Sequence, residues 1–109
     1  MRYEVSRLNE KILLKLEGDI DIAVAPQLRE ALEKILEEGA KKIVIDITNV
    51  PFIDSTGLGL FVNAYKKVSQ RGGWVAFVGA SRAIRKIFQL TKLEVLFKFC
   101  DTIEEASSL

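Results

Sequence analysis

Three oxygen-bearing side chains, Asp54, Ser55 and Thr56, stand directly ahead of a glycine and an apolar run in the segment VPFIDSTGLGLFV, residues 50 to 62. Such side chains often accept hydrogen bonds from the free N–H groups in the first turn of a helix, so one explanation is capping. The other explanation is that the serine hydroxyl is a target for modification. Gly57 favours a second role, because glycine inside a first turn costs up to about 1 kcal/mol relative to alanine. A glycine is easier to explain there if something approaches the backbone closely.

The chain contains no histidine, and this absence excludes most familiar catalytic chemistry. Without histidine there is no Ser-His-Asp or Cys-His machinery, no zinc site of the usual kind and no side chain that naturally titrates near neutral pH. Neither a Walker loop nor a GxGxxG motif occurs. We therefore expect a protein that is not an enzyme and that carries no cofactor and no metal ion.

Four aspartates leave acidic chemistry open: Asp19, Asp21, Asp46 and Asp54. By number alone they could form a metal-dependent hydrolase site, although the lack of a histidine ligand argues against it. Asp46 lies within a strand pattern, where a buried carboxylate usually needs a hydrogen-bond partner, so we expect a structural role. It could also imitate the phosphorylated aspartate of a response-regulator receiver domain. That class needs a lysine after a late strand, and none directly follows WVAFV, residues 74 to 78.

Composition limits the partners and the location. The chain has 109 residues, 49% of them hydrophobic and 28% charged, which predicts a single globular domain over residues 1–109. A net charge of +1 provides no strong field for nucleic acid or acidic lipids, so neither is an expected partner. The lone Cys100 cannot form an internal disulfide, and neither a signal peptide nor an apolar stretch of about 20 residues is present. We expect a cytoplasmic location without membrane insertion.

The elements that must position these residues follow from the hydrophobic pattern. Alternating or continuous apolar runs predict four strands, over residues 3–8, 11–18, 41–47 and 74–78. Helical spacing predicts four helices, over residues 24–38, from Leu58 to Gly72, over 81–90 and after Thr102. The stretch from Leu93 to Cys100 remains ambiguous between a strand and the tail of a helix. This order predicts an α/β fold in which an N-terminal hairpin joins parallel strands in one mixed sheet.

Three polar turns should lie at one edge of that sheet. They are GDID at residues 18–21, FIDSTG at 52–57 and GASR at 79–82. Sites in such sheets tend to form beyond the carboxyl ends of the strands, where loops lead into helices. The three turns could therefore converge, with Asp21 and Asp54 beside Ser55.

The segment FIDSTGLG resembles the signature of anti-sigma factor antagonists, which are members of the STAS domain family. The family motif reads roughly D-S-[ST/A]-G-[LIV]-[GAS], and the residues from Asp54 to Gly59 fill each of its positions. The segments LEGDID, KIVIDITNV and CDTIEEA also resemble family segments. The resemblance therefore extends over nearly the whole chain, and the family fold has the order of elements predicted above.

The resemblance implies a switch between partners. In this family the serine that matches Ser55 is phosphorylated by an anti-sigma factor that is also a serine kinase. The unmodified protein binds that factor and releases a sigma factor, and a separate phosphatase removes the phosphate. The expected contacts with the partner come from five further residues: Asp21, Asp54, Thr56, Gly57 and Leu58.

Two alternatives remain open beside this interpretation. Some STAS domains are accessory or scaffold modules of transporters and sensory complexes, although these often lack the serine. The segment after Asp21 is also unusual for the family, because Ile22, Val24 and Ala25 are apolar where polar residues are common. These residues either begin the core stripe of the following helix or form an apolar contact surface for another partner, including a second copy of the chain.

Overall fold

The computed structural model describes residues 1–109 and opens with the predicted hairpin. Strands β1 (Arg2–Leu8) and β2 (Lys11–Glu17) pair antiparallel without a register shift, from Arg2 opposite Glu17 to Leu8 opposite Lys11. Asn9 turns the chain between them with φ 60, a left-handed conformation that asparagine tolerates better than most residues.

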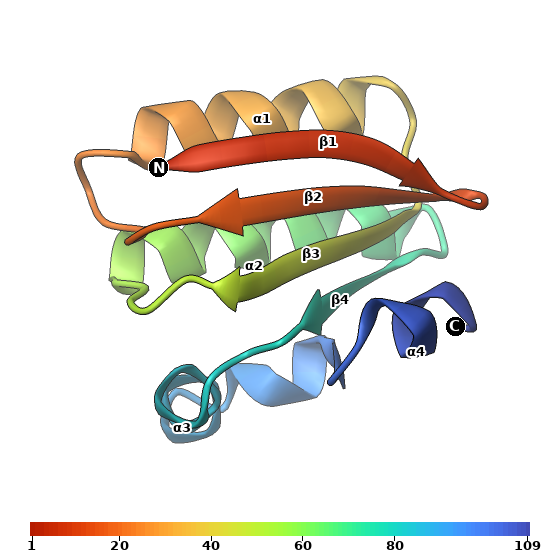
Figure 1. The fold of residues 1–109 in the computed structure, drawn as a ribbon. Helices are drawn as coiled ribbons and strands as arrows, with labels where there is room; N and C mark the ends of the chain where they lie inside the picture. The colour runs from red at the N-terminus through yellow and green to blue at the C-terminus, as the bar shows by residue number, and fades with distance from the viewer.

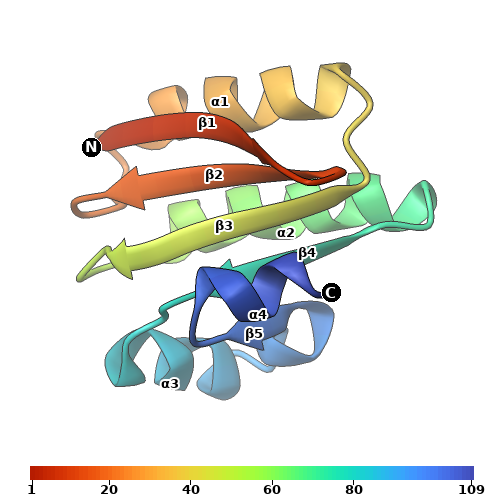
Figure 2. The same ribbon diagram turned by 45° about the vertical axis from the view of Figure 1, so that its right-hand side comes forward.

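The rest of the chain alternates helices with parallel strands, as Figures 1 and 2 show. In chain order the elements are α1 (Ala25–Glu37), β3 (Lys42–Asn49), α2 (Ser55–Gln70), β4 (Trp74–Val78), α3 (Arg82–Leu90), the 3-10 helix η1 (Leu93–Leu96), β5 (Lys98–Cys100) and α4 (Ile103–Ser107). The strands lie side by side in the order β1-β2-β3-β4-β5, and every neighbouring pair after the hairpin is parallel. The predicted mixed sheet with four α-helices is therefore confirmed, and its antiparallel hairpin differs from the parallel sheet of a receiver domain.

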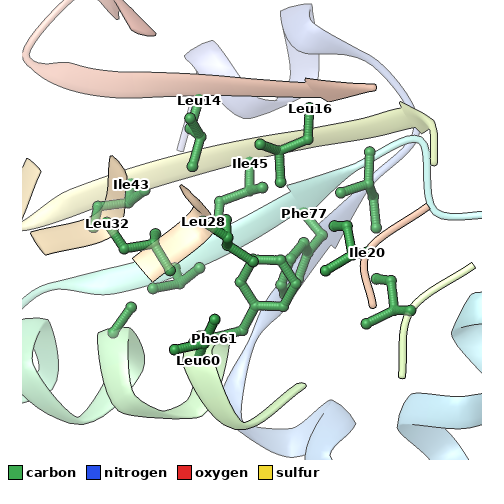
Figure 3. Packing of buried hydrophobic residues seen from close by; sticks show 14 of the residues in the cluster. Leu14, Leu16, Ile20, Leu28, Leu32, Ile43, Ile45, Leu60, Phe61 and Phe77 are labelled. Carbon is green, nitrogen blue, oxygen red and sulfur yellow. The ribbon is translucent and has the colours of Figure 1, made fainter. Parts of the chain in front are cut away.

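The two faces of the sheet bury different amounts of apolar surface. Alternate residues of β3 point to opposite faces, so Ile43, Ile45 and Ile47 join the main core beneath α1, α2 and α3, whereas Val44 contributes to a small cluster beneath α4. Figure 3 shows the main core, where Phe61 lies against Phe77 with ring centroids 5.1 Å apart. The short helix α4 covers the other face, in front of the sheet in Figure 2.

The segment from Leu93 to Cys100, ambiguous in sequence, divides into two short elements. Residues Leu93–Leu96 form η1 and Lys98–Cys100 form β5, which pairs parallel with β4. Lys92, with φ 61, turns the chain between α3 and η1. None of the helices has both the length and the apolar character needed to cross a bilayer.

Candidate functional site

Ser55 is the first residue of α2, and its side chain is exposed. The N-cap is Asp54, whose backbone is extended and whose Oδ1 accepts a hydrogen bond of 3.0 Å from the N–H of Gly57. Asp54 therefore caps α2. The Ser55 hydroxyl takes part in none of the side-chain hydrogen bonds, and it stands free at the tip of a sixteen-residue helix.

The loops after β2 and β3 run side by side at this edge. Ile20 forms a parallel bridge with Ile53, in which the Ile20 N–H donates to the Phe52 carbonyl at 2.8 Å and the Asp54 N–H donates to the Ile20 carbonyl at 3.0 Å. Two of the three predicted turns, 18–21 and 52–57, thus converge. The third predicted turn, at 79–82, lies against the end of β3 instead. Gly79 is so close to Thr48 there that a Cβ on Gly79 would collide with the Thr48 side chain.

Gly57 lies under the side chain of Ile20. A Cβ added to Gly57 would stand 2.6 Å from Ile20 Cγ2 and 3.1 Å from Ile53 Cγ2, both closer than side-chain carbons normally approach. Gly59, two residues further along the same helix, has no atom within 4 Å of the equivalent position. The close approach that the sequence suggested for Gly57 therefore comes from within the chain, and it seats the 18–21 loop on the first turn of α2.

The turn at Asp21 is ordered by its own carboxylate. Asp21 Oδ1 accepts hydrogen bonds from the N–H groups of Ala23 at 3.0 Å and Val24 at 3.3 Å, while the side chain remains partly exposed. Of the apolar residues that the sequence singled out here, Ile22 is 73% exposed, whereas Val24 packs against the core and Ala25 is buried. Ile22 is therefore the one of these three that can contact a partner.

The sequence reasoning missed Phe52, which is 47% exposed in the loop that bridges to Ile20. Its signal was an aromatic residue next to Pro51, in the predicted turn at 52–57 and outside every predicted helix and strand. We define the Ser55 surface as five side chains in and beside these two loops: Asp19, Asp21, Ile22, Phe52 and Ser55. Of the remaining predicted contact residues, Asp54 and Thr56 are partly exposed next to Ser55, and Gly57 and Leu58 are buried.

This surface combines one free hydroxyl with apolar and acidic groups. No histidine or lysine belongs to it, and no side-chain hydrogen bond joins the carboxylates of Asp19 or Asp21 to the Ser55 hydroxyl, so neither is placed as a general base for the serine. The Ser55 hydroxyl is accessible from solvent. The arrangement suits a docking surface with an accessible hydroxyl.

Asp46 is buried, and both of its short-range partners belong to Thr48. Its Oδ1 accepts hydrogen bonds from the Thr48 hydroxyl at 2.6 Å and from the Thr48 N–H at 3.0 Å. The expected structural role is confirmed: the carboxylate shapes the end of β3. The aspartates considered as metal ligands, Asp19, Asp21, Asp46 and Asp54, belong to no cluster of three or more groups that could hold a metal ion.

The sequence was compared with known families and proteins. A family model described as the STAS domain matches residues 3–106. The anti-sigma-B factor antagonist of Staphylococcus aureus (strain NCTC 8325 / PS 47) is 35% identical over 83 residues, which is 76% of this chain and 77% of that protein.

Solved structures share the fold. A candidate anti-sigma factor antagonist of Thermotoga maritima superposes with a TM-score of 0.91 and 28% identity, covering 97% of this chain and 92% of its own. The Bacillus cell fate determinant SpoIIAA in its phosphorylated form gives a TM-score of 0.77 with 21% identity, covering 98% of both chains. At that identity the likeness to SpoIIAA concerns the fold alone.

Proposed function

Because the chain belongs to the STAS domain family, we propose that it is an anti-sigma factor antagonist whose Ser55 surface binds an anti-sigma factor. The names of its relatives support this function, as does the residue pattern from Asp54 to Gly59. The observation that carries the proposal is the free Ser55 hydroxyl, exposed at the start of α2 while Asp54 supplies the cap. Sigma factors act in the cytoplasm, which is therefore the expected location.

The same surface supports a switch by phosphorylation. We propose that the anti-sigma factor is also a serine kinase, that it phosphorylates Ser55, and that a separate phosphatase restores the hydroxyl. Phosphorylation adds a charge of about −1.5 to −2 to a surface that already carries Asp19 and Asp21. The N-terminus of α2 would stabilise that charge by about 0.3 to 1 kcal/mol, so the fold should tolerate it.

Binding should respond much more strongly than folding. Ile22 and Phe52 offer exposed apolar contact area in the loops next to Ser55, and a partner docked on this surface would exclude water from the hydroxyl. A phosphate enclosed in that interface without a matching cation is costly, and its bulk also opposes docking. A penalty of about 3 kcal/mol would lower the affinity by about 150-fold, which suffices to exchange partners.

The other predicted contact residues take different parts in this proposal. Asp21 is partly exposed and could accept a hydrogen bond from the partner through its second carboxylate oxygen. Asp54 and Thr56 lie beside Ser55, where Asp54 fixes the first turn through Gly57. Gly57 and Leu58 are buried and would act by supporting the surface from below.

Calorimetry with an anti-sigma factor kinase from the same organism tests the proposal. We expect wild type and Ser55→Ala to bind with similar affinity, and Ser55→Asp to bind at least about 100-fold more weakly. Incubation with ATP should add one phosphoryl group to wild type and none to Ser55→Ala, as intact-protein mass spectrometry and peptide mapping would measure. Thr56→Ala is the matched control, and it should still be phosphorylated at Ser55.

Two results would contradict the proposal. Equal heats of association for wild type and Ser55→Asp would show that charge at Ser55 does not control binding. Phosphorylation at another residue would show that Ser55 is not the phosphorylation site. If no anti-sigma factor binds, the accessory or scaffold role in a transporter or sensory complex becomes the better explanation.

A further inference from the structure

The strand β1 ends the sheet and leaves one whole edge without a partner. It pairs with β2 on one side, and no strand follows it on the other side in the sheet order. Figures 1 and 2 show β1 as the outermost strand, with α1 behind one face of it. The outward N–H and C=O groups of a seven-residue strand are therefore available for pairing.

This edge lacks several of the devices by which proteins prevent strands from pairing. The sequence RYEVSRL contains no proline and no lysine, and its pairing with β2 has no bulge. Two apolar residues, Tyr3 and Val5, are 37% and 46% exposed. They stand opposite Leu16 and Leu14 of β2, so they lie on the face that carries the main core and extend it to the edge of the molecule.

We propose that β1 is an interface for a second copy of this chain, with the two β1 strands paired antiparallel about Val5. The sequence is complementary to itself in this register. Val5 stands opposite Val5 of the second copy, Tyr3 opposite Arg7 and Glu4 opposite Ser6. No like charges stand directly opposite, and the Arg7 of each copy stands opposite Tyr3 of the other copy on the same side of the sheet.

Neighbouring registers are less favourable. A shift of two residues in one direction places Glu4 opposite Glu4, which is repulsive, and shortens the ladder by two residue pairs. The same shift in the other direction places Ser6 opposite Ser6 and also shortens the ladder. A shift of one residue would place the helices of the two copies on opposite faces and separate the paired Val5 side chains. The register about Val5 alone pairs the full strand and joins the two apolar surfaces.

The dimer would leave both Ser55 surfaces free. Antiparallel pairing of the β1 strands joins the five strands of each copy into one continuous sheet, in which the second copy runs in the opposite direction. The Ser55 surfaces, at the carboxyl ends of β2 and β3, then lie at opposite ends of that sheet. Self-association should therefore be independent of the chemical state of Ser55.

Charge exchange at Val5 tests the interface and its register. We expect sedimentation velocity to show wild type as a dimer, and Val5→Lys and Val5→Glu each as a monomer at the same concentration, because position 5 faces itself. An equimolar mixture of the two variants should restore the dimer, since lysine then stands opposite glutamate. Val95→Lys is the matched control, because Val95 is 81% exposed in η1 and lies outside the interface.

The rescue by mixing also guards against misfolding, since a chain that fails to fold would not regain a dimer. A wild-type chain that stays monomeric up to about 1 mM overturns the proposal. A dimer that persists in Val5→Lys overturns it too, since the interface would then lie elsewhere. Ser55→Asp should dimerise as wild type does, so failure of the proposed switch and failure of this interface are separate outcomes.

Discussion

The two ends of the parallel strands use charge in different ways. At the carboxyl end, the carboxylates of Asp19 and Asp21 reach solvent, and the loops are held by backbone hydrogen bonds and by Ile20 packed on Gly57. At the amino end, the side chain of Lys11 is only 2% exposed. At the carboxyl end the charged groups form local contacts, such as those of Asp46 with Thr48 and of Asp54 with Gly57, whereas at the amino end a buried charge joins separate elements.

The amino end is held together by one buried ammonium group. Lys11 Nζ donates to Glu10 Oε1 at 2.9 Å and to the Ser107 carbonyl of α4 at 3.1 Å, and Glu10 also lies 3.7 Å from Lys42 Nζ. This network links the hairpin, the start of β3 and the C-terminal helix.

The comparison explains how a charge could be added at Ser55 without unfolding the protein. The contacts that join the two loops, the Ile20–Ile53 bridge and the packing of Ile20 on Gly57, are apolar or formed through the backbone, so they do not depend on the net charge nearby. Changes of charge should therefore alter binding at the carboxyl end and stability at the amino end.

Replacing the buried lysine tests the amino end most severely. Lys11→Met keeps a long unbranched side chain but removes both hydrogen bonds and leaves the Ser107 carbonyl without its side-chain donor. We expect the free energy of unfolding in urea to fall by about 1 to 3 kcal/mol. Hydrogen exchange in α4 should accelerate, because that helix loses its tie to β2.

The matched control is Lys15→Met, in the same strand but with an exposed side chain. It should change the stability by no more than about 0.5 kcal/mol. Neither variant should alter the affinity for the anti-sigma factor. Equal stabilities for the two variants would show that the buried network contributes nothing.

A pair of glycines in α2 tests the packing at the carboxyl end. Gly57→Ala places a methyl group against Ile20, and overpacking of this kind costs about 1 to 3 kcal/mol. The higher helix propensity of alanine offsets up to about 1 kcal/mol of this destabilisation. We expect a net loss of about 1 to 2 kcal/mol in the free energy of unfolding, together with weaker binding because the 18–21 loop must shift.

Gly59→Ala makes the same chemical change two residues away, where space is open. It should stabilise the protein by up to about 1 kcal/mol, because only the helix propensity changes. If both variants move the melting temperature in the same direction, the contact with Ile20 does not matter to the fold.

The sequence predicted most of the fold because the spacing of its apolar residues clearly follows the period of a strand or of a helix. Ile43 to Ile47 form a nearly continuous apolar run, interrupted by Asp46, that is typical of a strand covered on both faces, and β3 is such a strand. The segment from Leu93 to Cys100 could not be assigned, because a single turn of 3-10 helix followed by a three-residue strand is too short to show either period.

The candidate site was predicted less completely. The sequence placed Asp54, Ser55 and Thr56 at the start of a helix, but it could not decide which of them caps it. That choice depends on the extended backbone of Asp54, which is set by the bridge between Ile20 and Ile53. The bridge joins residues far apart in the chain, and no local pattern encodes it. The exposure of Phe52 and the burial of Lys11 likewise depend on tertiary contacts.

The smallest expected effect concerns Glu10 at low pH. The hydrogen bond from Lys11, followed by one from the backbone N–H of Glu10 itself, lowers the pKa of this carboxyl below its ordinary value of 4.5. The folded protein therefore binds this proton less readily than the unfolded chain does. Ionised Glu10 stabilises the fold above pH 4.5, and the contribution is lost as the pH falls through the lower folded pKa.

Urea unfolding of wild type and Glu10→Gln, from neutral pH to about pH 3, measures this contribution. We expect wild type to be more stable at neutral pH, and the difference to shrink once the pH falls below 4.5. Glu33→Gln, which removes an exposed carboxylate outside the network, should show a smaller change with pH. A difference between wild type and Glu10→Gln that stays constant across the range would mean that the ion pair with Lys11 is absent in solution. The stabilising contact at the amino end would then be the hydrogen bond from Lys11 to the Ser107 carbonyl alone.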